Sequence, residues 1–123
     1  MYLILIITFN FFLQDYVSIM KDNGETLILT QVRFYQTKST SSETTINYRE
    51  SGEKKTIELS ELKRINFKDL TGKKKGVQKW QVILVKRSNV KHDVELNLVE
   101  VSGIDSAGKQ YVISASSINK IML

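Results

Sequence analysis

The sequence predicts an all-β protein made of two duplicated small β-barrel-like or sandwich-like units, with antiparallel strands and short 3₁₀ turns. Three observations support this fold class: short runs in which apolar and polar residues alternate, turn-forming residues between these runs, and a sixteen-residue segment that occurs twice. No long segment keeps the 3.6-residue apolar period of an amphipathic helix. The 123 residues are enough for one compact domain, or for two very small domains that share a core.

In the first half of the chain, alternation predicts strands on both sides of short turns. Residues 26–35 form a long strand-like run, and they follow Asn23-Gly24, a pair that favours tight hairpin turns. Residues 44–49 and 55–59 alternate in the same way around Ser51-Gly52. We therefore expect a hairpin in each place.

In the second half, the pattern predicts a central strand and a bent one. Residues 79–87 are apolar on both faces, which is typical of a strand inside a sheet. Residues 93–104 alternate but change phase between Leu98 and Val99, so we expect a β-bulge there. The expected organisation is an apolar leader or first strand at 1–15, a first β unit at 16–67, a basic connector at 68–78 and a second β unit at 79–123.

The repeated segment is the clearest sign of internal duplication. Gly52–Phe67 reads GEKKTIELSELKRINF, and Gly108–Leu123 reads GKQYVISASSINKIML. The two align without a gap, and their apolar positions coincide. The identical pairs are Gly52 with Gly108, Ile57 with Ile113, Ser60 with Ser116 and Ile65 with Ile121.

Each copy has a strand, a serine that opens a tight turn, a buried aliphatic residue and a closing strand. We expect the hydroxyls of Ser60 and Ser116 to accept hydrogen bonds from backbone N–H groups of these turns. This ending resembles the closing segment of Sm-like small β-barrels, in which one 3₁₀ turn separates the last two strands. The resemblance covers about sixteen residues of each copy. It implies a strongly bent sheet or a barrel but no activity, because the uridine-binding residues of Sm-like proteins have no match here.

The N-terminal residues 2–13 are uncharged and almost entirely apolar. Their number suits the hydrophobic region of a secretory signal peptide and is too small for a membrane span of about 20 residues. Neither a preceding Lys or Arg nor a following small-x-small cleavage site is present. The segment is therefore either a leader of a periplasmic or secreted protein, or a buried first strand of a cytoplasmic one.

Positive charge is concentrated between Lys63 and Lys91, where ten basic residues are opposed only by Asp69. Such a segment can contact the phosphates of a polyanion while an indole ring stacks on a base or sugar. The alternative is a solvated connector or a protected sheet edge, with the tryptophan in the core. The candidate anion-binding residues are Lys73, Lys74, Lys75, Lys79, Trp80, Lys86, Arg87 and Lys91.

The sequence carries no motif for catalysis, for a cofactor or for a metal. Cysteine is absent, which excludes disulfides, zinc-thiolate sites and thiol nucleophiles. His92 is the only histidine, and we expect it to be a solvated turn residue. The segment Gly72–Gly76 has three lysines between two glycines, but it lacks the glycine spacing and the Lys-Ser/Thr ending of a P-loop.

We therefore expect a non-enzymatic β-domain of a bacterial cell envelope or a secreted protein, which acts as a binding or assembly module for a protein or a polyanion. The alternative is a cytosolic small-barrel protein that binds nucleic acid or another polyanion through residues 63–91. A leader at the N-terminus favours the first function, and a retained first strand favours the second.

Overall fold

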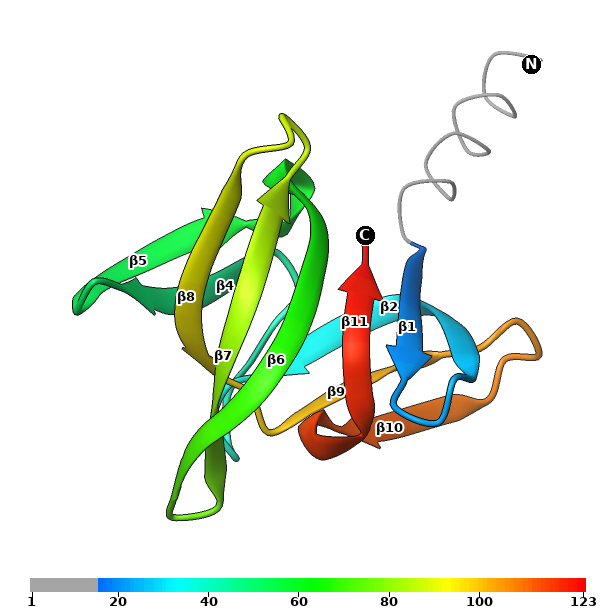
Figure 1. Ribbon diagram of the computed structural model, residues 1–123. Helices are drawn as coiled ribbons and strands as arrows, with labels where there is room; N and C mark the ends of the chain where they lie inside the picture. Colours follow the sequence, from blue (N-terminus) through cyan, green and yellow to red (C-terminus); the bar gives the residue numbers. More distant parts are fainter. Residues whose placement is uncertain (1–15) are drawn as a thin grey trace.

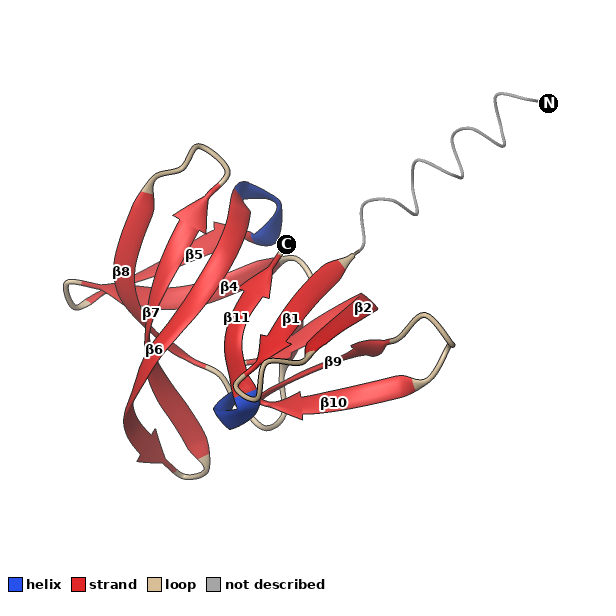
Figure 2. Ribbon diagram, turned by 45° about the vertical axis from the view of Figure 1, so that its right-hand side comes forward, coloured by secondary structure: helices blue, strands red, loops and turns tan. Residues whose placement is uncertain are grey.

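The computed structural model describes residues 16–123, and this part of the chain is all-β, as predicted (Figure 1). Its strands are β1 (Val17–Lys21), β2 (Thr26–Tyr35), β3 (Ser41–Ser42), β4 (Thr45–Glu50), β5 (Glu53–Glu58), β6 (Leu62–Lys74), β7 (Val77–Lys86), β8 (Lys91–Asn97), β9 (Glu100–Ile104), β10 (Gln110–Ser114) and β11 (Ile118–Met122). Two 3₁₀ turns, η1 (Leu59–Glu61) and η2 (Ala115–Ser117), are the only helical elements in residues 16–123 (Figure 2). None of the helices in these residues could span a membrane. The predicted leader or first strand at 1–15 lies outside the described residues.

The strands form one antiparallel sheet that does not close on itself. Its order is β10-β9-β2-β1-β11-β6-β7-β8-β4-β5, with β3 paired to β2 outside this path. We call β4 to β8 the arm half, and β1, β2 and β9 to β11 the terminal half (Figure 1). The arm half is one continuous stretch of the chain, whereas the terminal half combines strands from both ends of the described residues.

The two copies of the repeated segment meet at the centre of the sheet. Both fold as strand, 3₁₀ turn and strand: β5-η1-β6 in the first copy and β10-η2-β11 in the second. Strands β6 and β11 are neighbours, and Ile65 lies directly opposite Ile121, its counterpart in the repeat. Outward from this pair, the order is β6-β7-β8-β4-β5 on one side and β11-β1-β2-β9-β10 on the other. The two orders correspond strand for strand: β7 matches β1, β8 matches β2, β4 matches β9 and β5 matches β10.

The 3₁₀ turns are held by backbone bonds and by buried aliphatic residues. The N–H of Leu62 donates to Leu59 in η1, and the N–H of Ile118 donates to Ala115 in η2. Leu62 and Ile118 are buried, as the repeat predicts. The expected capping by Ser60 and Ser116 was wrong: in η2 the cap is the hydroxyl of Ser114, which accepts from the Ser116 N–H, and η1 has no side-chain cap.

The change of phase at Leu98 and Val99 marks a crossing between the halves instead of the expected bulge. The Leu98 N–H donates to Gln78 on β7 at 3.0 Å, whereas the Val99 N–H donates to Tyr35 on β2 at 2.7 Å. Strand β8 therefore ends in the arm half, and β9 begins in the terminal half. Successive residues face different neighbours here, and this reverses the apolar alternation.

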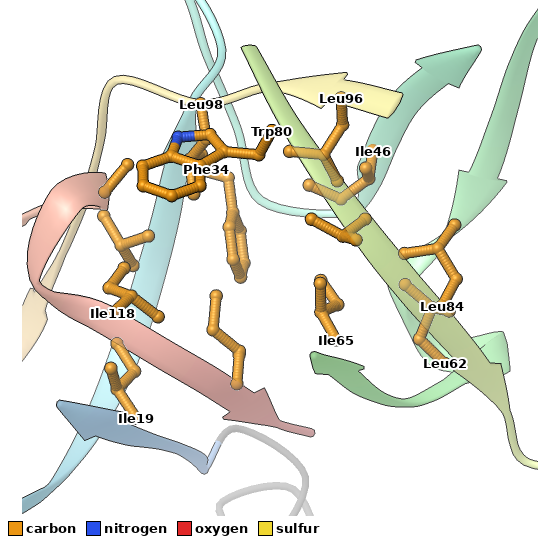
Figure 3. Packing of buried hydrophobic residues seen from close by; sticks show 14 of the residues in the cluster. Ile19, Phe34, Ile46, Leu62, Ile65, Trp80, Leu84, Leu96, Leu98 and Ile118 are labelled. Atoms are coloured by element: carbon orange, nitrogen blue, oxygen red, sulfur yellow. The ribbon is translucent and has the colours of Figure 1, made fainter. Parts of the chain in front are cut away.

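Buried aliphatic and aromatic side chains from both halves form one core. Ile19 and Ile118 of the terminal half and Leu62 and Leu84 of the arm half belong to the same cluster (Figure 3). Its members pack across the central β6–β11 pair. The two halves are therefore joined both by backbone pairing and by a continuous apolar interior.

Candidate anion-binding groove

The hairpin of β6 and β7 extends beyond the core as a basic arm (Figure 1). We call residues 68–79 the lysine arm; they include the segment that we expected to connect the two β units. Lys73, Lys74, Lys75 and Lys79 of the arm are exposed. Lys75 and Gly76 form its turn, with φ of 53° and 80°. A two-residue turn with positive φ at both positions suits the twist of a hairpin.

An open groove of about 1060 Å³ lies between the lysine arm and the β4–β5 hairpin, with β8 between them. Basic side chains line it from both sides, and Glu95 is the only acidic residue among those that line it. The basic residues of the groove are Arg49, Lys54, Lys55, Lys73, Lys74, Lys75 and Lys79.

Gln36 bridges the floor of the groove where β4 and β8 separate. These strands share a single ladder pair, Arg49 with Glu95. The amide nitrogen of Gln36 donates to the carbonyls of Asn47 at 2.7 Å and Asn97 at 3.0 Å, while its oxygen accepts from the Asn47 N–H at 2.9 Å. One side chain therefore connects the two strands and satisfies their free backbone groups.

A further cation reaches the tip of the arm from the segment after β2. The end of the Lys38 side chain lies against Gly76, where a Cβ atom would overlap its Cε and Nζ. Gly76 thus allows both the turn and the close approach of Lys38. This lysine adds charge to the cluster formed by Lys73, Lys74 and Lys75.

Lys55 is the one groove cation that is paired with a carboxylate within residues 16–123. Its Nζ lies 2.9 Å from Glu50 Oε1, and His92 Nδ1 lies 2.8 Å from Glu50 Oε2. The hydrogen bond from Lys55, followed by that from His92, holds the pKa of Glu50 below its usual value. The same pairing raises the pKa of Lys55.

The remaining groove cations have no carboxylate oxygen within 4.0 Å in the described part of the chain. Arg49 instead donates to the carbonyl of Gly52 at 3.3 Å. The groove therefore carries positive charge on two facing walls with little internal compensation.

The structure separates the predicted anion-binding residues into three groups: groove lysines, a core tryptophan and three residues away from the groove. Lys73, Lys74, Lys75 and Lys79 line the groove. Trp80 is only 8% exposed and packs edge-on against Phe67, with ring centroids 5.7 Å apart, so its ring is part of the core.

The other three residues lie toward the opposite end of β7. Lys86 is partly buried and ends that strand, and Lys91 pairs with Val85. The Nε of Arg87 donates to the carbonyl of Ser60 at 2.9 Å. None of the three lines the groove.

Sequence reasoning missed Lys38, Arg49, Lys54 and Lys55. They come from segments that precede the lysine arm by about thirteen to thirty residues. The pairing of β4 with β8 brings the β4–β5 hairpin, with Arg49, Lys54 and Lys55, opposite the arm, and Lys38 reaches it from the segment after β2. The adjacent Lys54 and Lys55 beside a predicted turn indicate a basic hairpin, but they do not indicate that this hairpin lies opposite the lysine arm.

His92 is not the solvated turn residue that we expected. It lies on β8, and its side chain is 26% exposed beside Glu50. In residues 16–123 no group of three or more His, Cys, Asp or Glu side chains is placed to hold a metal ion. His92 therefore links β8 to β4 through its hydrogen bond with Glu50.

Acid is expected to weaken the contacts that Glu50 makes with β5 and β8. Because its pKa is lowered from the ordinary value of 4.5, ionised Glu50 stabilises the fold above that pH, and the stabilisation disappears as the pH falls through the lowered pKa. Urea unfolding at about pH 5 and about pH 3 should show a larger loss of stability in the wild type than in Glu50→Gln. Glu53→Gln, at an exposed position of β5, should lose as much as the wild type. Equal losses in wild type and Glu50→Gln would contradict this role.

Comparison with family models, curated proteins and solved structures finds no match for the chain.

Proposed function

We propose that the protein is a non-enzymatic module that binds a linear polyanion in the groove beside the lysine arm. The observation that carries the proposal is the row of unpaired cations on two facing walls. Lys54 lies on one wall, and Lys74 and Lys79 lie on the other. A polymer with repeated negative charges can contact both walls at once.

Electrostatics favours such a ligand because the lysines of the arm repel one another. Two unit charges about 7 Å apart interact by about 0.6 kcal/mol in water, and by more near a protein surface. Lys38, Lys73, Lys74 and Lys75 gather at the tip of the arm, so their like charges repel one another. A bound polyanion would replace this repulsion with attraction and release its own counterions.

The strand order supports a further proposal about architecture: two five-stranded barrel-like units that have exchanged their first two strands. One unit would combine β1 and β2 with β9, β10 and β11, and the other would combine β7 and β8 with β4, β5 and β6. In both, a 3₁₀ turn precedes a closing strand that pairs with the first strand. The proposal agrees with the resemblance to Sm-like barrels, which implies a strongly bent sheet or a barrel.

Under this architecture the lysine arm is an addition to one unit. The arm joins β6 to β7, which are consecutive in the chain. Their counterparts β11 and β1 also pair with each other, but they are not consecutive, so no hairpin joins them. A feature present in one copy only is a natural place for a function that the other copy lacks.

We place this module in the bacterial envelope or outside the cell, on the basis of the apolar residues 2–13. Its polyanion would then be a polymer of that compartment. The mass of the native N-terminus tests the location: loss of the first residues supports export, and a retained N-terminus in a cytosolic protein contradicts it.

Binding should depend steeply on salt and on the lysine arm. We expect a labelled oligodeoxythymidylate to bind with an affinity that falls as salt rises, measured by fluorescence anisotropy. In the triple variant Lys73→Ala, Lys74→Ala, Lys75→Ala, affinity should drop by about tenfold or more. The slope of log affinity against log salt should decrease by about 2, because each phosphate contact contributes about 0.7.

A second triple variant removes the same charge from the same basic segment but outside the groove: Lys63→Ala, Lys86→Ala, Lys91→Ala. It should keep most of the affinity of the wild type. Equal losses in the two triple variants would show that net charge alone attracts the ligand. Absence of salt-dependent binding would contradict the proposed function.

A further inference from the structure

We infer that the groove recognises the phosphates of a phosphodiester chain and makes no stacking or edge contact with bases. This inference rests on the proposed function and specifies the class of ligand. Three features of the groove carry it: the burial of its aromatic residue, the use of its polar groups within the fold, and the type and placement of its cations.

The groove offers no ring on which a base could stack. Tyr48 is the only aromatic residue among those that line it, and it is 9% exposed and part of the core. Trp80, next to Lys79 in sequence, packs against Phe67 in the core. Proteins that bind single-stranded nucleic acid by stacking present exposed aromatic side chains beside their basic residues. That element is missing from the groove.

Two amide side chains of the floor, those of Gln36 and Asn47, are already engaged in hydrogen bonds within the fold. Gln36 uses its amide nitrogen and its oxygen on the backbones of Asn47 and Asn97. The side-chain oxygen of Asn47 accepts from the Thr56 hydroxyl at 2.7 Å. Bidentate recognition of a base edge requires free amide or guanidinium groups in a fixed plane. Neither Gln36 nor Asn47 therefore has its whole amide free for bidentate recognition of a base edge.

The cations that remain are almost all lysines. Lysine is a point charge on a flexible stem, so it attracts phosphate without imposing a planar geometry. Arg49, the only guanidinium of the groove, already donates to Gly52. Such a set distinguishes ligands by charge density and not by the shape of a base.

The placement of these lysines favours a chain over a single phosphate ion. Lys74 pairs with Val77 and Lys79 pairs with Gly72, which makes the two lysines diagonal neighbours across the ladder, roughly 7–8 Å apart. Lys54 faces them from β5 across an open groove. A single phosphate would contact only part of this array, whereas successive phosphates of a polymer can contact all of it.

The test compares an oligodeoxythymidylate with an abasic oligonucleotide of equal length, which keeps every phosphate and lacks every base. We expect their dissociation constants to agree within about twofold. Each stacked base contributes about 1–3 kcal/mol, which is a factor of about five or more per base. Tighter binding of the oligodeoxythymidylate by about tenfold or more would overturn the inference and leave the proposed function intact.

The Lys73, Lys74 and Lys75 triple alanine variant should weaken binding of the two probes by the same factor. Inorganic phosphate should displace them no better than sodium chloride of equal ionic strength, and stronger displacement would overturn the assignment to a polymer. If neither probe binds in a salt-dependent way, the proposed function itself fails.

Discussion

Replacing Ile65 or Ile121 with alanine is expected to lower the free energy of unfolding by about 2–5 kcal/mol. Ile65 is 1% exposed and Ile121 is 0% exposed, and they lie opposite each other on β6 and β11. Each substitution removes buried methyl groups and leaves a cavity where the arm half meets the terminal half. Urea denaturation measures the loss from the midpoint and slope of the transition.

A matched control is Ile28→Ala, because Ile28 lies on β2 and is 51% exposed. It should change stability by less than about 1 kcal/mol. A cost at Ile65 or Ile121 as small as that of the control would mean that the central pair is not part of the core. The loss of unfolding free energy in the double variant should differ from the sum of the two single losses, since neighbouring residues are energetically coupled.

The same substitutions also test whether the halves unfold together. Trp80 is the only tryptophan, and its fluorescence reports the core of the arm half. Circular dichroism reports the strands of both halves. Because the core is continuous, the two signals should change in one transition, before and after substitution.

Replacing Gly103 with valine is expected to lower the free energy of unfolding by about 1–3 kcal/mol, because the added side chain overpacks the space between β9 and β2. Gly103 lies on β9 against an irregular part of β2, where the register shifts between Thr30 and Arg33. A Cβ atom at this position would be 2.9 Å from Leu29 Cβ and 3.1 Å from the Thr30 carbonyl oxygen. Since one of these neighbours is backbone, β2 itself would have to move.

Gly72→Val is the control for this substitution. A Cβ atom at Gly72 would meet only Lys79 Cβ, at an ordinary 4.0 Å. Stability should therefore change by less than about 1 kcal/mol. Thermal or urea unfolding compares the two variants, and equal effects would show that the close approach of β9 to β2 is not restrictive.

Local sequence patterns predicted most of the strands because side chains alternate with a period of two residues on a sheet. The hairpin around Ser51-Gly52 is present as β4 and β5, and the long run at 26–35 is β2. The repeat predicted two strand–3₁₀–strand segments and the buried aliphatic residues of their turns, Leu62 and Ile118. These features depend on residues that are neighbours in the chain.

The pairing of distant strands could not be predicted in the same way. Nothing in the alternation of β2 specifies β9 as its neighbour, and the crossing at Leu98 and Val99 has the same local pattern as a bulge. For the same reason the sequence indicated only one wall of the groove. Lys73, Lys74 and Lys75 form a visible charge run, whereas Lys54 and Arg49 reach the groove through the non-local pairing of β4 with β8.

The central position of β11 has a consequence for the order in which the molecule can fold. This strand, residues Ile118–Met122, lies between β1 and β6. During synthesis from the N-terminus, β1 can pair with β2 early, but its other partner is made only after β2 to β10 have been made. The sheet must therefore stay incomplete until Ile118–Met122 have been made, and its many long-range pairings favour slow folding. A nascent chain that has not yet reached β11 exposes apolar edges of β1 and β6, which makes products that end before Ile118 prone to aggregation.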